Sequence, residues 1–531
     1  MNQRHYLLKG TFLLTLTGLL TRMAGFFYKI FLSRTIGAAE IGRFQLTLPV
    51  YAFCMALSCG GIQTAISRFT AEYYAEKDKR SAFRILACAL MLSGGLSLGC
   101  GAALFFGSSW IAASFLLEPS CDMLLKMIAL SLPFSAVHGC INGFLIGQKN
   151  VSVSAASQLL EQMLRIVSVF FFSAIFQKSG RSMDASVMAL GQIAGEISAA
   201  LFCMYHLFFG KQPSIEPLED VSNHTKPSFH TLFQLVQRDM KKPLSVSMPL
   251  GINRMLICVL QGIEAALLPQ MLGLFGHNSS EALAVYGTLT GMTMPLILFP
   301  TAVTGSLGTL LLPVISEDRA LGKDKKIAGT ISASFQGSLL LGYFFLTAFL
   351  LFGNDAGQLL FHSSLAGSFA QKLALICPFL YINTTLINIL HGLGKTVAAS
   401  VWNVIAFGIR LYFIIALVPE AGIDGYFIGM LLSQAFVTAC SLVTLYRQTH
   451  FAADLTDTII KPALICIVSG AGLEALKLLF PGLCGGSVPA LLFSVLLYTS
   501  VFLLLALLLL LRKEERSKLL SAFRQRPIVK I

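Results

Sequence analysis

The opening of the chain carries three cations in a segment that otherwise suits the interior of a membrane. Residues 19–37 read LLTRMAGFFYKIFLSRTIG, and their only charged side chains are Arg22, Lys29 and Arg34. An uncompensated charge at the centre of a bilayer costs roughly 2.5–3.5 kcal/mol on insertion scales. Cations kept there without a neighbouring acid indicate a water-filled cavity and a negatively charged ligand.

The spacing of these cations predicts a shared binding surface. Arg22 and Lys29 are seven residues apart, so on a helix they project from nearly the same face, about 10 Å apart along the axis. Arg34 follows near the outer end, where reaching to the membrane interface is its alternative role. Arg254 in GINRM (251–255) matches Arg22 in GLLTRM (18–23). Because guanidinium groups bond phosphate oxygens two at a time, we expect Arg22, Lys29 and Arg254 to bind a phosphate-bearing substrate.

Acidic residues are fewer in the apolar segments. Glu161 and Arg165 stand at i and i+4, so they either neutralise each other or take part in coupling. Glu196, Glu264 and Glu474 are further candidates, and Glu264 either binds a coupling cation or pairs with a positive side chain. The coupling ion would be Na⁺ or H⁺. The cysteines and histidines show no metal-ligand spacing, so no metal site and no cofactor is predicted.

These residues lie in a chain whose composition is that of a membrane protein. Of 531 residues, 55% are hydrophobic and 12% charged, and the mean hydropathy is +0.74. Apolar runs long enough to cross a bilayer recur throughout. We expect an all-α polytopic protein with about fourteen membrane helices, at 8–33, 41–66, 83–107, 122–146, 151–176, 185–209, 244–269, 282–312, 331–353, 371–391, 396–418, 423–446, 462–480 and 488–511.

The distribution of Lys and Arg predicts the orientation of these helices. With the N-terminus in the cytoplasm, most of the basic residues fall in inside segments, and only five fall outside: Arg34, Arg43, Lys178, Arg181 and Lys372. This bias predicts a multi-pass protein of the cytoplasmic membrane with both termini cytoplasmic. It also accounts for the net charge of +13 as attraction to anionic membrane lipids, so no nucleic-acid partner is predicted.

A weak internal repeat predicts two halves. GQKNVSVSAASQLLEQMLRI (147–166) resembles GLGKTVAASVWNVIAFGIRL (392–411), which sets Arg165 against Arg410. An even number of helices between the repeats gives halves of the same orientation, as in transporters with a central site. We therefore predict an N-lobe at 1–209, a cytoplasmic linker with an interfacial amphipathic helix at 210–243, a C-lobe at 244–450, extra helices at 451–511 and a basic tail at 512–531.

The chain lacks the motifs of an enzyme. It has no phosphate-binding Gly-Lys-Ser/Thr loop, no His-Glu-x-x-His and no nucleophile elbow. The extramembrane loops are too short to form a catalytic domain. We therefore expect no catalytic residues and no hydrolysis of ATP on this chain.

Several blocks of the sequence resemble a known family. They are TRMAGFFYKIFLSRTIGAAEIGRFQLTLPVYAFCMALSCGGIQTAISRFTAEYYAEKDK (21–79), TMPLILFPTAVTGSLGTLLLPVISE (293–317) and the Gly-x-Gly-Lys turn at 392–395. They resemble the stage V sporulation protein B and polysaccharide-biosynthesis branch of the multidrug/oligosaccharidyl-lipid/polysaccharide exporter superfamily. That resemblance implies a MATE-like fold, with two six-helix lobes in a V, a terminal helix pair, a central cavity and movement of lipid-linked sugars.

The resemblance also bears on the cations of the first helix. Relatives in the family flip the undecaprenyl-pyrophosphate-linked peptidoglycan precursor, lipid II. The first helix of these relatives resembles the pattern Arg-x-x-Gly-Phe-x-Arg-Asp. Arg22, Gly25 and Phe26 match this pattern, whereas Tyr28 and Lys29 stand in the Arg-Asp places. Arg22 is thus the residue that the resemblance carries over, and Lys29 is similar only in charge. In the sporulation branch, the resemblance implies a role in spore cortex peptidoglycan.

Three functions follow from the sequence. The first is a flippase for a lipid-linked saccharide of cell-wall or spore cortex synthesis. The second is a cation-coupled multidrug antiporter, which would need acids in its cavity, whereas the first helix has none. The third is a membrane partner of cell-wall synthesis enzymes that transports nothing.

Overall fold

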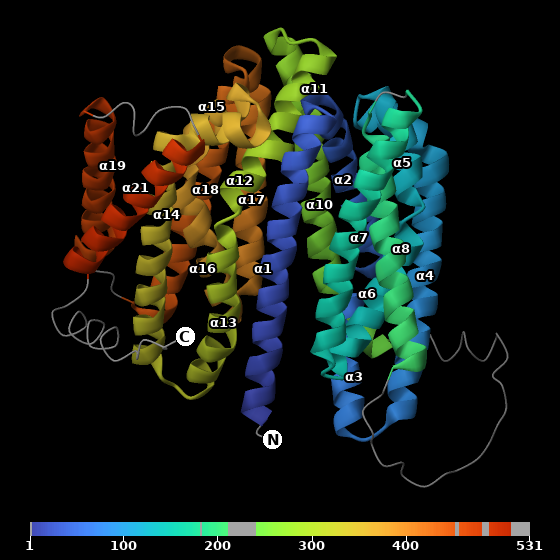
Figure 1. Cartoon of the computed structure of the whole chain (residues 1–531). Coiled ribbons are helices and arrows are strands. Elements are labelled where there is room, and N and C mark those ends of the chain that lie inside the picture. The colour runs from blue at the N-terminus through green and yellow to red at the C-terminus, as the bar shows by residue number, and fades with distance from the viewer. Residues whose placement is uncertain (1–2, 181–182, 211–240, 452–455, 480–487, 511–531) are drawn as a thin grey trace, which may run out of the picture. The chain divides into compact units, whose positions relative to one another are not determined.

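The computed structural model describes residues 3–180, 183–210, 241–451, 456–479 and 488–510, which fold almost entirely as helices (Figure 1). The predicted amphipathic helix within the linker at 210–243 and the basic tail at 512–531 lie outside these residues. The helices form two compact units. Unit 1 comprises Met1–Met292 with Ile414–Gly425, and unit 2 comprises Thr293–Phe413 with Tyr426–Ile531.

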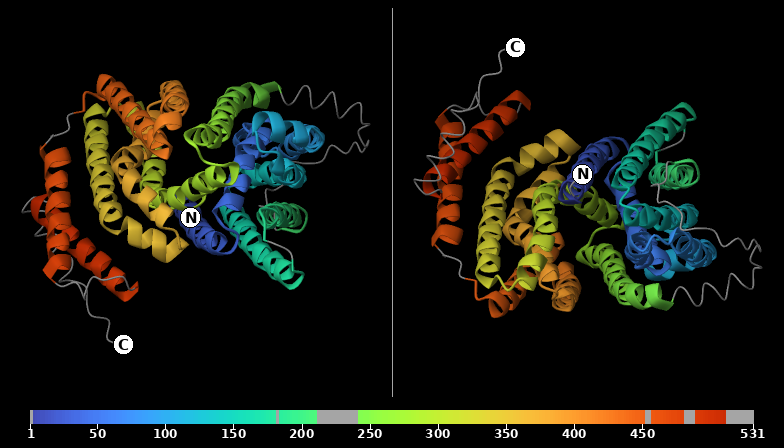
Figure 2. Two further views of the ribbon diagram at one scale, coloured as in Figure 1. Left: turned by 90° about the horizontal axis from the view of Figure 1, so that it is seen from above. Right: turned by 90° about the horizontal axis from the view of Figure 1, so that it is seen from below.

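Unit 1 begins with a long helix and continues as a bundle, seen along its axes in Figure 2. Its helices are α1 (Gln3–Thr35), α2 (Ala38–Cys59), α3 (Ile62–Ala75), α4 (Lys79–Trp110), α5 (Asp122–Ala129), α6 (Leu132–Gly147), α7 (Val151–Lys178), α8 (Ser186–Phe209), α10 (Lys241–Phe275) and α11 (Ser279–Gly287). Helix α7 packs on α8 and α1, while α2 packs on α10 and α11.

Unit 2 consists of the helices that follow, without the segment Ile414–Gly425, which groups with unit 1. They are α12 (Met294–Leu298), α13 (Thr301–Ala320), α14 (Asp324–Phe361), α15 (Ser364–Leu373), α16 (Cys377–Gly392), α17 (Thr396–Ala421), α18 (Ile423–Thr449), α19 (Lys461–Leu479) and α21 (Val488–Leu509). Helices α13, α14 and α16 enclose a core of buried Ile, Leu and Phe side chains. The terminal pair α19 and α21 packs on α14 around Tyr498, whose hydroxyl donates to the Phe344 carbonyl at 3.0 Å.

Packing against α2 explains why α10 and α11 belong to unit 1, and for α11 two glycines make this packing close. A Cβ added to Gly287 of α11 would lie 1.9 Å from the Ala38 oxygen, and one added to Gly42 of α2 would lie 2.2 Å from the Leu283 oxygen. The backbones of α2 and α11 thus touch directly. The predicted lobes at 1–209 and 244–450 are defined by the sequence repeat, whereas the two units are defined by contacts between helices. The boundaries of the lobes therefore stay a prediction.

The number of membrane helices is close to the sequence expectation. The described residues contain twelve helices long and apolar enough to cross a membrane, or thirteen if the bent pair Pro119–Ala129 and Leu132–Gly147 is one span. The protein is thus an all-α multi-pass membrane protein, and its described residues contain twelve or thirteen such helices where the whole sequence predicts about fourteen. Helix α1 is not among the helices counted in the described residues, and residues 19–35 of it carry Arg22, Lys29 and Arg34.

Two of the breaks between helices lie at prolines. The bent pair meets at 44° just before Pro133, which is the second residue of α6. The predicted span 282–312 is divided at Pro300, between the end of α12 and the start of α13. A proline lacks the amide hydrogen that a continuous helix needs, which accounts for the break.

Candidate functional site

The predicted cations of α1 lie on one uninterrupted helix. Because α1 runs unbroken from Gln3 to Thr35, Arg22 and Lys29 are held two turns apart on nearly the same face. Arg22 is exposed and Lys29 is half-buried. Within the described part of the chain, neither forms an ion pair. Neither charge is neutralised by a described carboxylate, and the binding of an anionic ligand by these residues stays a prediction.

Arg254 lies on α10 in the same unit. It is exposed and, among the described residues, has no carboxylate partner. Helix α10 packs on α2, α3 and α11, whereas α1 packs chiefly on α7. The structure thus shows no contact that joins Arg254 to Arg22 or Lys29. Their meeting at one ligand stays a prediction.

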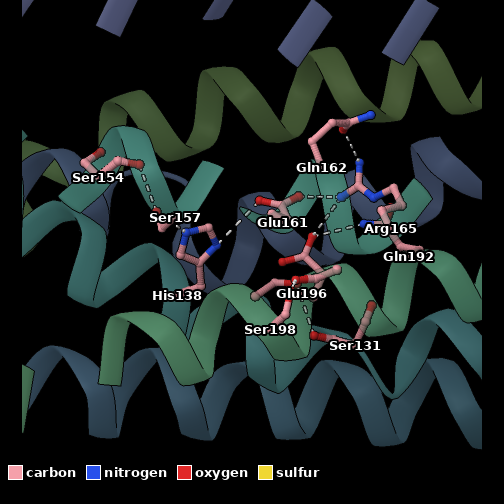
Figure 3. Close-up of polar contacts among 12 residues, drawn as sticks. Ser131, His138, Ser154, Ser157, Glu161, Gln162, Arg165, Gln192, Glu196 and Ser198 are labelled. Carbon is pink, nitrogen blue, oxygen red and sulfur yellow. Dashed lines mark hydrogen bonds and ion pairs between the residues drawn. The ribbon is translucent and has the colours of Figure 1, made fainter. Parts of the chain in front are cut away.

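A buried polar network lies at the middle of four helices of unit 1 (Figure 3). Glu161 and Arg165 flank the midpoint of α7, and Glu196 is close to the midpoint of α8. His138 and Tyr51 occupy the middle of α6 and α2. Glu196 is only 8% exposed. These side chains would stand near the centre of a membrane that the helices cross.

Glu196 is held by groups from three helices. Gln192 donates to its Oε1 at 3.0 Å, and the Tyr51 hydroxyl donates to the same oxygen at 3.3 Å. The guanidinium of Arg165 pairs with Glu161 and lies 3.9 Å from Glu196. The pair that the sequence proposed at Glu161 and Arg165 is therefore present. Glu196, from a different helix, adds a second carboxylate near Arg165.

His138 completes the network on the other side of Glu161. Its Nδ1 lies 3.8 Å from Glu161 Oε2, and its Nε2 lies 3.3 Å from the Ser157 hydroxyl. The ligand atoms of His138, Glu161 and Glu196 lie within 4.8 Å of one another, close enough to hold a metal ion. However, the Arg165 guanidinium pairs with Glu161 and lies 3.9 Å from Glu196, so a positive charge already stands beside this group. Two positive unit charges 4 Å apart repel by about 4 kcal/mol at a protein-like dielectric, and more for a divalent ion.

Small residues on α8 let the two helices approach closely enough for these contacts. A Cβ added to Gly195 would lie 3.1 Å from the Glu161 carbonyl oxygen and 3.2 Å from Arg165 Cβ. A Cβ added to Gly191 would collide with Val169 at 2.3 Å. The glycines thus set the spacing of α7 and α8. That spacing determines how near Glu196 comes to Arg165.

The network also reaches the helix that carries the cations. Gln162 accepts from Arg165 Nη1 at 3.5 Å, and its Nε2 lies 3.5 Å from the position of a Cβ on Gly25 of α1. Further along the same seam, the rings of Phe31 and Phe170 are 4.0 Å apart. Gln162 therefore links Arg165, the partner of the carboxylates, to α1.

The remaining predicted site residues lie apart from this network. Glu264 is buried on α10 beside Tyr286 of α11. Arg34 is exposed near the end of α1. Arg410, in unit 2, stacks on the Phe407 ring at 4.1 Å. The sequence did not single out Tyr51, His138 or Gln192, although a polar residue in the middle of an apolar helix is a usable signal.

A neutral polar network occupies the corresponding helices of unit 2. Asn383 of α16 donates to Gln434 Oε1 on α18 at 2.8 Å and to the Gln434 carbonyl at 3.1 Å. Thr438 donates to Asn383 Oδ1 at 2.9 Å. Asn383 is the seventh residue of α16, as His138 is of α6, and Arg410 is the fifteenth of α17, as Arg165 is of α7. The two networks therefore lie at matching places in the repeat.

The comparison with known families decides which family this chain belongs to. A family model described as "Polysaccharide biosynthesis protein" matches residues 7–319. The chain belongs to this family. Stage V sporulation protein B of Bacillus subtilis (strain 168) is 27% identical over 462 residues, 87% of each chain. Lipid II flippase MurJ of the same organism is 22% identical over 502 residues, 88% of this chain and 86% of its own.

Solved structures show the same fold. The inward closed conformation of lipid II flippase MurJ superposes with a TM-score of 0.70 at 12% identity, covering 93% of this chain and 98% of that one. An inward-facing multidrug resistance MATE transporter gives 0.59 at 15% identity, covering 82% and 96%. The chain thus has a MurJ- and MATE-like fold. With the family model and the two curated relatives, it is a transporter of the multidrug/oligosaccharidyl-lipid/polysaccharide superfamily and not an enzyme.

Proposed function

We propose that this transporter moves a lipid-linked saccharide across the cytoplasmic membrane by alternating access, for cell-wall or spore cortex synthesis. The diphosphate of an undecaprenyl-pyrophosphate-linked peptidoglycan or polysaccharide precursor would engage Arg22, Lys29 and Arg254. The observation that carries this proposal is that these three cations have no carboxylate partner within the described residues. Kinship with stage V sporulation protein B and with a lipid II flippase supports it.

The energetics favour an anionic cargo. Each unpaired cation at membrane depth costs roughly 2.5–3.5 kcal/mol unless water or an anion compensates. A diphosphate presents several oxygens to the guanidinium fork and to the ammonium group, and charge-assisted hydrogen bonds of this kind are about twice as strong as neutral ones. The cost of keeping these cations is therefore offset when the substrate is bound.

The buried network of unit 1 would bind the coupling ion, which we propose to be a proton. With His138 neutral, two carboxylates and one guanidinium leave the network with a single negative charge. A proton bound at Glu196 removes that charge. The titratable and charged side chains that face this site are Tyr28 of α1, Tyr51 and Cys59 of α2, His138 of α6, Glu161 and Arg165 of α7, and Cys203 of α8.

A cation-coupled multidrug antiporter is the second candidate. The two buried carboxylates, Glu161 and Glu196, favour it because such exporters bind positively charged drugs or ions. The unpaired cations of α1 oppose it, since they would repel a cationic drug. A drug-susceptibility panel with cells that lack the protein separates the two candidates: unchanged susceptibility supports the flippase.

The predicted orientation, with both termini cytoplasmic, is part of the proposal. It would place the basic segments against anionic lipid headgroups on the cytoplasmic side. Cell-wall synthesis enzymes are the protein partners that this function would bring near. Labelling of single cysteines near each terminus with an impermeant reagent tests the orientation, because labelling of intact cells would contradict it.

The decisive experiment follows a defined lipid-linked saccharide in proteoliposomes. A fluorescent headgroup is quenched from outside, and the protected fraction reports translocation. We expect Arg22→Ala to abolish translocation and Arg22→Lys to retain part of it, since charge is kept but bidentate bonding is lost. Arg84→Ala, an exposed arginine near the start of α4, is the matched control and should translocate normally. Normal translocation by Arg22→Ala would refute the proposed site.

A further inference from the structure

An apolar groove runs along the outside of unit 1, where α4 meets α5 and α6. Its volume is about 300 Å³, and every lining residue is apolar or glycine, including Leu98, Ala102, Phe106, Ala129 and Leu130. Phe106 is 84% exposed and Leu98 61%. Helix α4 lies at the edge of unit 1 in all views (Figures 1 and 2). On a membrane-spanning helix, such a recess opens toward lipid.

The floor of the groove is made by close approach of two helices. A Cβ added to Gly101 of α4 would lie 3.2 Å from the Ala129 carbonyl oxygen of α5. Small side chains at Ala102 and Ala129 keep the recess open above this contact. An unfilled recess forfeits the dispersion contacts of its lining, so a hydrocarbon chain stabilises it.

A polar cluster closes one end of the groove. Ser108 and Ser109 of α4 donate to Asp122 Oδ1 at 2.6 and 3.0 Å, and Lys126 donates to Asp122 Oδ2 at 2.8 Å. Ser109 follows Phe106 by one turn, and Lys126 precedes Ala129 by one turn, so both helices place the cluster at the same end. The side chains of Lys126 and Asp122 are 34% and 31% exposed, which leaves both charges accessible.

The dimensions match one leaflet of a bilayer. From Leu98 to Ser109 the helix rises about 16 Å at 1.5 Å per residue, about half of a 30 Å hydrocarbon core. Trp110, 69% exposed, lies beside the polar cluster, where aromatic side chains mark the membrane interface. The groove thus spans one leaflet, and the cluster lies at headgroup level.

We propose that this groove binds a zwitterionic phospholipid of the bilayer, with an acyl chain between α4, α5 and α6 and its headgroup at the polar cluster. Lys126 would contact the phosphate, and Asp122 would contact an ammonium group. The paired opposite charges favour a headgroup that also carries both signs, such as phosphatidylethanolamine, over a purely anionic one. This inference is independent of the proposed transport activity.

Trp110 offers a direct readout, because the chain has only two tryptophans. In a Trp402→Phe background, Trp110 is quenched by phospholipids that carry bromine on an acyl chain, in nanodiscs of phosphatidylcholine. We expect brominated phosphatidylethanolamine to bind about threefold or more tightly, a difference of about 0.7 kcal/mol, than brominated phosphatidylglycerol, which lacks an ammonium group. The same preference is expected over brominated phosphatidylcholine, whose quaternary ammonium has no N–H to donate to Asp122. Equal quenching by all three headgroups would overturn the proposal.

Three variants separate the groove from its surroundings. Ala102→Phe fills the groove and should abolish the headgroup preference, whereas Ala103→Phe, on an adjacent exposed position of α4, should keep it. Lys126→Gln lies outside the packed core and should remove the preference without changing the fold. Identical quenching by the two Phe variants would exclude the groove. Relief of quenching by polyprenyl phosphate at a low mole fraction would assign it to an isoprenoid carrier instead, which also overturns the proposal.

Discussion

The buried networks of the two units occupy matching helices and differ in charge. In unit 1, α6, α7 and α8 bring together His138, Glu161, Arg165 and Glu196. In unit 2, α16 and α18 bring together Asn383, Gln434 and Thr438, which are all neutral. Both networks tie the middle of a bundle together with hydrogen bonds. Of these two networks, only that of unit 1 contains ionisable side chains, so matching positions of the repeat carry different charge.

One substitution along the repeat shows how the difference arises. The eleventh residue of α7 is Glu161, and the eleventh residue of α17 is Ala406, while the arginine four residues later is kept in both. In unit 1 the arginine therefore has an i−4 carboxylate on its own helix. In unit 2 Arg410 stacks on Phe407 instead.

The largest expected effect comes from removing the central cation of unit 1. Arg165→Met leaves Glu161 and Glu196 buried beside each other without a counter-charge, which typically costs about 3–5 kcal/mol. Asn383→Leu in unit 2 leaves only neutral groups short of a partner and should cost about 1–3 kcal/mol. Thermal unfolding of both variants in the same detergent checks the order. Equal losses of stability would show that the charged network of unit 1 is no more sensitive to the loss of a partner than the neutral network of unit 2.

The next effect concerns helix spacing. Gly195→Ala places a methyl group 3.1 Å from the Glu161 carbonyl oxygen, so α7 and α8 must separate, at about 1–3 kcal/mol. Gly408→Ala on α17 meets nothing within 4 Å and should be neutral or stabilising by up to about 1 kcal/mol. Unfolding temperatures of the two variants should therefore move in opposite directions. A neutral Gly195→Ala would mean that the close approach is dispensable.

A third test turns the network of unit 1 into one like that of unit 2. Glu196→Gln keeps the shape and the hydrogen-bonding capacity but removes an ionisable group. In proteoliposomes with this variant, the effect of an imposed pH gradient on the translocation rate should fall about tenfold, which corresponds to about 1.4 kcal/mol. Gln434→Leu should leave the response to the gradient unchanged. Dependence on a Na⁺ gradient rather than on pH would refute the proton.

The smallest expected effect concerns the N-caps of two helices, α4 in unit 1 and α14 in unit 2. Asp78 caps α4 by accepting from the Ser81 amide at 3.0 Å, whereas the N-cap of α14, Lys323, provides no side-chain cap. Hydrogen bonds from Ser81 lower the pKa of Asp78 below its usual value of about 3.9. The stabilisation is therefore complete above about pH 4 and is lost as the pH falls through the lowered pKa.

Replacing this cap should cost little. Asp78→Ala should lower stability by about 0.5–1 kcal/mol at neutral pH, while Asp78→Asn should keep the cap and remove only its acid dependence. Lys323→Ser at α14 should raise stability slightly. Thermal unfolding at neutral and acidic pH measures all three. An Asp78→Asn variant that still loses stability in the same acid range would place the titrating group elsewhere.

The sequence by itself determined the membrane character, the helix order and the unpaired cations. Long apolar runs and helical spacing are local properties, so the face shared by Arg22 and Lys29 followed from the seven-residue interval. The i, i+4 pair of Glu161 and Arg165 followed in the same way. The span at 282–312 was wrong, because Pro300 ends a helix that hydropathy alone continues.

Only the tertiary structure decided which distant residues meet. Glu196 joins Arg165, and Tyr51 joins Glu196, because glycines at 191 and 195 let α8 approach α7 and because α2 packs against the same bundle. Polar residues in the middle of an apolar helix are visible in a sequence, but their partners are not. Contacts between helices depend on packing angles and on side-chain volumes summed over the whole bundle, and no local pattern records that sum.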